Sequence, residues 1–206
     1  NPILAPEKGT GQVLKVHSIF PTFQGEGPYV GYPSVFVRLS GCNLACDFCD
    51  TEFDEFEEMD VQQILSQVQE LAGAKTKLVV ITGGEPFRQP IGKFCEALLA
   101  AGFKVQIETN GTIAAPAGID WICVSPKANA ELVQTSGDEL KLVFPQDENK
   151  PANFEHLKFE NFCLQPRDDS YKGGPAGVNA QAAFDYCLKN PRWRLSVQTH
   201  KYIGVP

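Results

Sequence analysis

The chain has 206 residues and a formal net charge of −7, and 43% of its residues are hydrophobic. This length suits one domain with a sizeable core, so we expect a single domain over residues 1–206. The 25 acidic residues outnumber the 18 basic ones, whereas a protein that grips DNA or RNA needs a basic surface, so direct nucleic-acid binding is not expected. No apolar run approaches the length of a membrane span, and the first residues lack a signal-peptide pattern. We therefore expect a cytoplasmic protein with no membrane partner.

The apolar pattern predicts alternating strands and helices after a short lead-in. Residues 1–11 are rich in proline and glycine and are expected to form a flexible arm. The expected strands are 12–20, 34–40, 78–81, 104–108, 121–124, 139–144, 162–165 and 194–199, and the expected helices are 61–72, 91–101 and 179–188. This alternation predicts an α/β fold with a parallel sheet covered by helices. Because a complete eight-unit barrel takes about 250 residues, we expect an open, partial barrel of about six strands.

Three cysteines, Cys42, Cys46 and Cys49, stand in a Cys-x3-Cys-x2-Cys array directly after the first strand of the expected barrel. Three thiolates on one short loop can ligate three corners of a cubane iron–sulfur cluster, which leaves the fourth iron open to a second cofactor. Two alternatives are a zinc site, which usually takes four ligands in two pairs, and three buried structural cysteines. The polar residues within the array disfavour burial, and no fourth Cys or His lies close in sequence. The spacing therefore favours a cluster.

The other four cysteines, Cys95, Cys123, Cys163 and Cys187, sit singly in apolar segments. Such cysteines are commonly buried free thiols. They indicate a reducing compartment rather than a disulfide framework.

Polar motifs follow most of the expected strands. They are Thr82-Gly-Gly-Glu-Pro86, Glu108-Thr-Asn-Gly111, Ser125-Pro-Lys127, Gln165-Pro-Arg-Asp168 and Gln198-Thr-His-Lys201. Each alone is an ordinary turn or surface loop, but the carboxyl ends of parallel strands meet at one edge, where ligands bind. The series therefore predicts a polar cavity mouth around a cluster. In it Glu85 could bind an ammonium group and Arg38 a carboxylate, although a structural ion pair explains Arg38 equally well. A lone His200 near the end is more often structural.

The cysteine array with Phe48 inside it, together with the Gly-Gly-Glu-Pro turn, resembles the radical S-adenosylmethionine superfamily. Longer strings resemble one family within it, the 7-carboxy-7-deazaguanine synthases of the queuosine and deazapurine pathways. These strings include Phe23-Gln-Gly-Glu-Gly27, Arg38-Leu-Ser-Gly-Cys-Asn43, Glu108-Thr-Asn-Gly-Thr112 and Trp193-Arg-Leu-Ser-Val-Gln-Thr-His-Lys-Tyr202. The matching strings span nearly the whole chain from about Val16 onward.

The resemblance implies an enzyme, a carbon–nitrogen lyase that contracts the ring of 6-carboxy-5,6,7,8-tetrahydropterin to 7-carboxy-7-deazaguanine with loss of ammonia. It implies a 4Fe-4S cluster, S-adenosylmethionine that is reductively cleaved to start the reaction, and Mg²⁺. It also implies a homodimer, and an electron donor of flavodoxin-like or ferredoxin-like type.

The resemblance also implies roles for individual residues. The cluster ligands would be Cys42, Cys46 and Cys49, with Thr51 as a magnesium ligand. S-adenosylmethionine would contact Phe48, Cys49, Asp50, Gly84, Glu85, Ser125, Pro126, Lys127, Gln165, Pro166, Arg167 and Asp168, although Arg167 matches the family pattern poorly. The pterin would contact Phe23, Gln24, Gly25, Glu26, Arg38, Thr82 and Pro206.

Two other functions share part of this pattern. An activating enzyme for a glycyl-radical protein would have the cysteine array and the Gly-Gly-Glu-Pro turn, but not the substrate-side set with Gln24, Arg38 and 193–202. A zinc or iron–sulfur binding module without turnover would leave the polar loops at the other strand ends unexplained.

Overall fold

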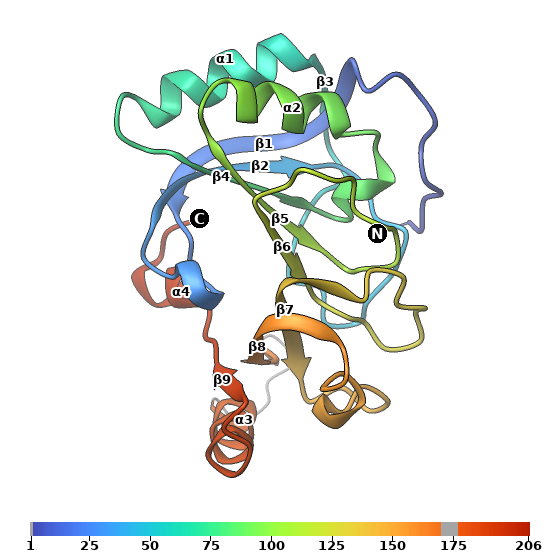
Figure 1. Ribbon diagram of the computed structural model, residues 1–206, viewed down its shortest axis with the longest axis vertical. Coiled ribbons are helices and arrows are strands. Elements are labelled where there is room, and N and C mark those ends of the chain that lie inside the picture. Colours follow the sequence, from blue (N-terminus) through green and yellow to red (C-terminus); the bar gives the residue numbers. More distant parts are fainter. Residues whose placement is uncertain (1, 170–176) are drawn as a thin grey trace.

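The structure is a computed structural model that describes residues 2–169 and 177–206 (Figure 1). Its strands are β1 (Val13–Phe23), β2 (Pro33–Leu39), β3 (Glu57–Asp60), β4 (Leu78–Gly83), β5 (Lys104–Thr109), β6 (Trp121–Val124), β7 (Ser136–Phe144), β8 (Lys158–Pro166) and β9 (Trp193–Leu195). Its α-helices are α1 (Val61–Ala72), α2 (Gly92–Ala100), α3 (Val178–Lys189) and α4 (Thr199–Ile203), with 3-10 turns η1 (Gly27–Tyr29), η2 (Pro86–Arg88) and η3 (Pro151–Asn153).

All strands belong to one sheet in the order β3-β1-β2-β4-β5-β6-β7-β8-β9. From β2 to β9 every neighbouring pair is parallel, whereas β1 runs antiparallel to both β2 and β3. The sheet curves without closing, because β3 and β9 are edges. This confirms the open, partial parallel barrel, with seven parallel strands when the three-residue β9 is included.

The helices cover two separate cores. Helices α1 and α2 lie together over β1, β2 and β4, whereas α3 lies beside β8 and β9 at the far end (Figure 1). Helix α1 has the bounds that its sequence predicted, because Asp60 accepts hydrogen bonds from the backbone N–H groups of Gln62 and Gln63 at 2.9 Å and so caps its first turn. One apolar core lies under α1 and α2, and a second lies between β7, β8 and α3 around the buried Trp193.

Two elements differ from the sequence-based expectation. Strand β3 was not predicted, because its residues are mostly acidic and exposed and it exists only through its pairing with β1. The closing strand predicted over 194–199 is wrong in its second half. Ser196 still donates its N–H to the carbonyl of Leu164, but Thr199 then donates to the carbonyl of Gly25 and begins α4.

The N-terminal segment, expected as a flexible arm, has defined contacts. Its Ile3 forms a β-bridge with Cys42, and the N–H of Leu4 donates to the carbonyl of Cys42 at 2.8 Å. Further along, the Glu7 carboxylate pairs with buried Arg88 at 2.9 Å. The segment therefore lies against the first cysteine of the array. Among the described residues, none of the helices has the length and apolar character that a membrane crossing requires.

Candidate active site

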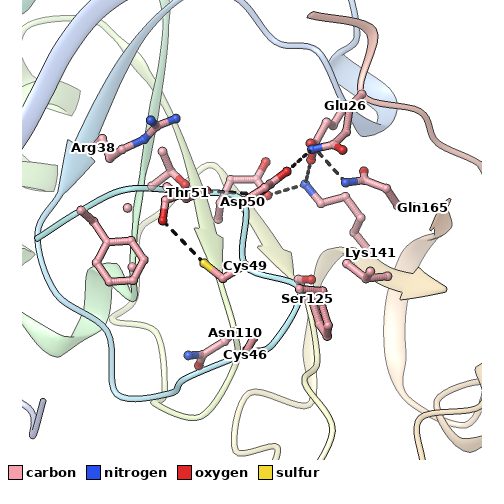
Figure 2. A pocket seen from close by; sticks show the side chains of 18 of the residues that line it. Glu26, Arg38, Cys46, Cys49, Asp50, Thr51, Asn110, Ser125, Lys141 and Gln165 are labelled. Atoms are coloured by element: carbon pink, nitrogen blue, oxygen red, sulfur yellow. Dashed lines mark hydrogen bonds and ion pairs between the residues drawn. The ribbon is translucent and has the colours of Figure 1, made fainter. Parts of the chain in front are cut away.

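A cavity of about 750 Å³ opens where the parallel strands end (Figure 2). Most of the residues that the sequence proposed for a site lie on its wall: Phe23, Gln24, Glu26, Arg38, Cys42, Cys46, Phe48, Cys49, Asp50, Thr51, Thr82, Gly84, Ser125, Lys127, Gln165, Pro166, Arg167, Asp168 and Pro206. These residues are spread over the chain from 23 to 206. The fold therefore brings them to one place, as the strand-end argument predicted.

The cysteine array forms one side of this cavity. The Cys42 side chain is buried, Cys46 is partly buried and Cys49 is exposed, and all three are free thiols. Burial raises the pKa of the Cys42 thiol, and the nearby Glu85, Cys46 and Cys49 raise it further. Burial also raises the pKa of Cys46, although the ammonium of Lys127 opposes this. The positive charge of Lys127 thus favours the thiolate form of Cys46.

The three thiols on one loop match the donor set of a cubane cluster. Within residues 2–169 and 177–206, no three Cys, His, Asp or Glu side chains converge closely enough to hold one metal ion. A zinc ion needs its ligands within about 2.3 Å of one centre, whereas the thiolates of a cubane cluster bind different irons. Three free thiols on one loop therefore suit three corners of a 4Fe-4S cluster.

The turn after β4 packs directly on the cysteine array. A Cβ added to Gly84 would lie 2.2 Å from the carbonyl oxygen of Gly41, and one added to Gly83, whose φ is +140°, would lie 2.0 Å from that of Leu39. Only glycine permits this approach. The glycines are therefore required by the close packing of the backbone. Gly84 also lies on the cavity wall, so the same residue can contact a ligand.

Glu85 lies off the cavity wall. Its side chain is fully buried behind the wall, and its carboxylate accepts hydrogen bonds from the N–H of Phe87 at 3.0 Å, the hydroxyl of Thr109 at 2.8 Å and the N–H of Asn110 at 2.7 Å. Burial raises the pKa of Glu85, against the effect of these hydrogen bonds. Glu85 therefore braces the turn and does not face an ammonium group in the cavity.

Gly25 and Pro126 also lie off the wall, contrary to the contacts that the resemblance implied. A Cβ on Gly25 would lie 2.1 Å from Nδ1 of His200, so this glycine lets the His200 ring pack on the backbone. The carbonyl of Pro126 accepts a hydrogen bond from Gln146. Both residues shape the site from behind.

Asn110 is a wall residue that the sequence argument had treated as part of an Asn-Gly turn. Its side-chain amide donates to Asn43 Oδ1 at 3.0 Å, and Asn43 in turn donates to the Thr112 hydroxyl at 2.8 Å. The end of β5 is thereby tied to the cysteine array. The pairing of Asn43 with a residue 67 positions away has no local signal in the sequence.

Arg38 extends from β2 toward the cavity on the side opposite the group of Glu26, Lys141 and Gln165 (Figure 2). Its guanidinium lies 5.4 Å from the Phe20 ring, which stacks on Phe36 at 5.6 Å. Burial lowers the pKa of Arg38, while the Asp50 carboxylate opposes this. Its Nε is buried with no hydrogen-bond partner among the described residues. A cation beside an aromatic wall is thus available for an anionic, flat ligand.

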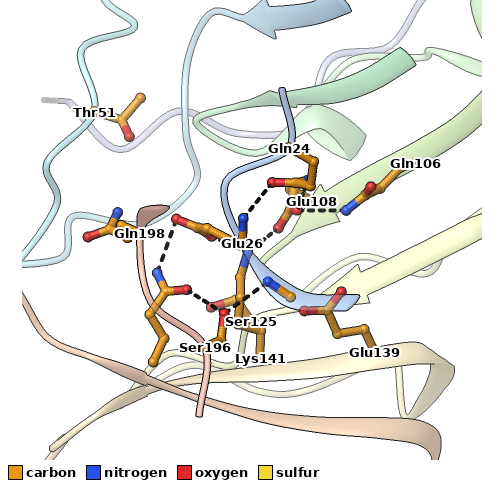
Figure 3. Close-up of polar contacts among 12 residues, drawn as sticks. Gln24, Glu26, Thr51, Gln106, Glu108, Ser125, Glu139, Lys141, Ser196 and Gln198 are labelled. Atoms are coloured by element: carbon orange, nitrogen blue, oxygen red, sulfur yellow. Dashed lines mark hydrogen bonds and ion pairs between the residues drawn. The ribbon is translucent and has the colours of Figure 1, made fainter. Parts of the chain in front are cut away.

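The floor of the cavity carries a buried charge network (Figure 3). The ammonium of Lys141 pairs with Glu26 and, at 2.6 Å, with Glu108. Burial alone would raise the pKa of Glu26, but the Lys141 charge outweighs it and lowers that pKa. Burial also opposes the charge on Lys141, yet Cys123 and the glutamates around it raise its pKa. The signal for Lys141 was present in the sequence, since a lysine within a buried strand must have a partner.

Polar contacts also join the rim of the cavity. Lys201 of α4 pairs with Asp50 at 2.7 Å and with Asp168 at 2.9 Å, so it links the cysteine array to the segment after β8. Arg167 pairs with Asp169 at 2.9 Å. The Lys127 ammonium donates to the Ser125 carbonyl at 2.6 Å, and burial lowers its pKa. Gln198, His200 and Lys201 also lie on the wall, in agreement with the placement of their motif at the predicted cavity mouth.

The comparisons with known proteins agree with this geometry. A model of the radical SAM superfamily matches residues 36–138. That segment holds the cysteine array, the Gly-Gly-Glu-Pro turn and the first parallel strands, and the chain belongs to this superfamily.

Similar individual proteins identify the family within this superfamily. A 7-carboxy-7-deazaguanine synthase from Caulobacter vibrioides is 50% identical over 93% of this chain and 98% of that protein. One from Bradyrhizobium diazoefficiens is 47% identical over 92% of this chain and 98% of that protein. The solved structure described as QueE from Escherichia coli matches with a TM-score of 0.72 at 26% identity, over 91% of this chain and 95% of that one. Within the superfamily the chain belongs to the 7-carboxy-7-deazaguanine synthase family, as the sequence strings predicted.

Proposed function

We propose that this chain converts 6-carboxy-5,6,7,8-tetrahydropterin into 7-carboxy-7-deazaguanine with release of ammonia, in the route to queuosine and other deazapurines. The observation that carries the proposal is one cavity that joins three free thiols on one side to Arg38 and an aromatic wall on another. Family membership and the relatives' printed names support the same reaction.

Cys42, Cys46 and Cys49 would hold a 4Fe-4S cluster. When bound, the cluster and S-adenosylmethionine supply the one-electron radical chemistry that begins the reaction. The chain itself contributes position and charge. The docked N-terminal segment and the glycine turn fix Cys42, and the nearby Lys127 favours the thiolate form of Cys46.

The nucleoside cofactor would lie between the cysteine array and the ends of β4, β6 and β8. The prospective contacts are Phe48, Asp50, Gly84, Ser125, Lys127, Gln165, Pro166, Arg167 and Asp168, which share the cavity wall. The backbone at Gly84 offers polar groups without a side chain in the way, and the charged residues suit the amino-acid end of the cofactor. Glu85 and Pro126 would act only by holding this wall in place.

The pterin would lie over the charged floor. Arg38 has no hydrogen-bonded partner for Nε among the described residues and suits the substrate carboxylate. The rings of Phe20 and Phe23 suit the flat face of a pterin, and Gln24, Glu26 and Thr82 offer polar edges, with Pro206 at the rim. Thr51 also lies on the wall and offers an oxygen to Mg²⁺, a cation that prefers oxygen ligands.

The cellular setting follows from the same chemistry. Seven free cysteines suit a reducing cytoplasm. The exposed Cys49 places the prospective cluster near the surface, where a small flavodoxin-like or ferredoxin-like reductant could deliver electrons. Assembly as a homodimer belongs to the proposal through the family.

The proposal is tested by anaerobic reconstitution of the full chain with iron and sulfide. The protein is then incubated with reductant, Mg²⁺, S-adenosylmethionine and the carboxylated pterin. Chromatography with mass detection should show 7-carboxy-7-deazaguanine and one equivalent of ammonia, and Cys46→Ala should abolish both. Cofactor cleavage without any change in the pterin would contradict the substrate, and Cys95→Ala serves as the matched control because that cysteine lies in the core away from the cavity.

A further inference from the structure

Lys141 occupies an unusual place for a charged residue. It lies in the interior of β7 between Leu140 and Leu142, which are both fully buried, and its side chain is 6% exposed. Burying an ammonium is costly unless it is paired. The residues that pair with Lys141 therefore indicate its role.

The two partners come from segments far apart in the sequence and lie close together beside Lys141 (Figure 3). Glu26 follows β1 and is also held by Gln165 of β8, whose amide donates to it at 3.2 Å. Glu108 ends β5 and also accepts hydrogen bonds from the Gln24 and Gln106 amides, at 3.2 and 2.9 Å. Among the described residues, Lys141 is the cation that pairs with both. One ammonium thus ties the segment after β1 to β5 and β7.

A third carboxylate, Glu139, lies two residues before Lys141 on the same strand. One of its oxygens accepts from the Trp121 indole at 3.2 Å, and the other is buried with no partner among the described residues. That second oxygen packs on the backbone of Gly27, where an added Cβ would lie 2.2 Å from it. Burial raises the pKa of Glu139 to about 7. Glu139 is therefore mostly neutral on the acidic side of pH 7, which leaves the Lys141 charge to Glu26 and Glu108.

We propose that Lys141 is a positioning residue for the pterin site, which holds the Glu26 and Glu108 carboxylates together and so keeps the segment 24–27 closed beneath the substrate. This inference rests on the proposed function. Without the ammonium, the two carboxylates would repel each other in a largely buried place. Glu26 would then take up a proton or turn away, and it would carry with it Gln24, whose side-chain oxygen accepts the N–H of Glu26 at 3.1 Å.

Other titratable groups face this network from every neighbouring element. Strand β6 contributes Cys123, strand β8 contributes Cys163, and α4 contributes His200. Burial raises the pKa of both thiols, so they are neutral near pH 7, and it lowers the pKa of His200, which favours the neutral ring. Lys127 adds a second, more distant positive charge. Glu26 therefore depends chiefly on Lys141 for its ionised state.

The test compares Lys141→Met with the conservative Lys141→Arg in the reconstituted full chain. Thermal unfolding is followed from pH 4 to pH 8 without pterin, and pterin affinity is measured separately. In the wild type, the lowered pKa of Glu26 gives stability that is present above its ordinary value and lost on acidification. In Lys141→Met burial should instead raise the pKa of Glu26, so this loss on acidification should disappear and the variant should lose stability relative to the wild type as the pH rises from 4 to 8. Pterin binding should weaken about tenfold or more. Lys141→Arg should recover most of both.

Lys158→Met is the matched control, since Lys158 is an exposed lysine at the start of the adjacent strand. A Lys141→Met protein with the pH profile and pterin affinity of this control would overturn the proposal. If Lys141→Met does not fold, the double variant Glu26→Gln/Lys141→Met should fold, because one of the two mutually repelling carboxylates is gone and Glu108 keeps its hydrogen bonds from the Gln24 and Gln106 amides. A double variant that is equally unfolded contradicts the proposal. The unfolding profile contains no pterin, so a wild-type protein that fails to bind pterin would count against the proposed function alone.

Discussion

Arg38 shows how a single residue can indicate a ligand. No hydrogen bond or ion pair joins its side chain to another described residue, although it is partly buried beside Phe20 and faces the cavity. A partly buried guanidinium is normally paired with an anion, so the lack of such a partner for Arg38 among the described residues points to an anion from outside the chain. Several other charged groups around the cavity, among them Lys141 and Lys201, already have partners within the protein. This contrast supports the proposed contact between Arg38 and the substrate carboxylate.

Arg38→Ala should raise the Michaelis constant for the carboxylated pterin about 10- to 100-fold and change kcat far less, because the interaction is made before and during the reaction alike. Arg38→Lys should recover little, since an ammonium cannot bind a carboxylate through two parallel hydrogen bonds. Steady-state kinetics on the reconstituted enzyme measure both effects. An unchanged Michaelis constant in Arg38→Ala would remove the proposed contact.

Glu85 allows two explanations of one motif to be separated. A glutamate that bound the cofactor's ammonium group would, on replacement by Gln, weaken cofactor binding strongly. The structure instead predicts that Glu85→Gln lowers the free energy of unfolding by about 1–3 kcal/mol, because the NH2 group of the new amide would face the N–H group of either Phe87 or Asn110, two donors that bind different oxygens of Glu85. The Michaelis constant for S-adenosylmethionine should change less than about threefold. Denaturant unfolding and kinetics on one preparation decide between the two explanations.

At the scale of elements, the sequence predicted the helices and strands whose formation depends mainly on residues close in the chain. Helix α1 followed from its cap at Asp60 and its apolar spacing, and β6 followed from four apolar residues. Strand β3 could not be predicted, because only its distant partner β1 makes it a strand. Likewise the polar loops at strand ends predicted the cavity, yet the pairing of Lys141 with Glu26, 115 residues away, needed the fold. Long-range contacts such as these could not be predicted from the sequence.

The N-terminal segment is an element with a testable role. Glu7 pairs with Arg88 and Lys15, at 2.9 and 3.0 Å, and Arg88 donates to the carbonyl of Ser40 beside the cysteine array. Glu7→Gln should lower the free energy of unfolding by about 1 kcal/mol and speed the loss of cluster iron in air, because the segment over Cys42 is loosened. Iron release to a chromogenic chelator measures the second effect. Glu58→Gln on exposed β3 is the control, and equal release rates in the two variants would contradict this role.

At the scale of the whole molecule, the barrel contains two glutamates, Glu26 and Glu139, whose pKa shifts have opposite effects on how stability depends on pH. The lowered pKa of Glu26 adds stability that is lost on acidification, whereas the pKa of Glu139, raised to about 7, has the opposite sign. The folded state holds the Glu139 proton more tightly than the unfolded state does. Stability from this group is therefore complete below pH 4.5 and falls as the pH rises toward and through 7.

Glu139→Gln should remove that fall, because an amide resembles the protonated carboxyl and does not ionise. Each pKa unit of difference corresponds to about 1.4 kcal/mol, so the variant should gain on the wild type steadily between pH 5 and pH 8. Urea unfolding at several pH values provides the measurement. A variant whose pH profile parallels that of the wild type would show that Glu139 is ionised throughout.

Three cysteines on one loop would leave one iron of a 4Fe-4S cluster open to S-adenosylmethionine. Electron paramagnetic resonance of the reduced, anaerobically reconstituted chain tests it most directly. We expect the spectrum of a reduced 4Fe-4S cluster that changes when S-adenosylmethionine is added, and we expect this spectrum to be absent in Cys46→Ala. A protein that takes up no iron, or a cluster spectrum that saturating S-adenosylmethionine leaves unchanged, would contradict the account.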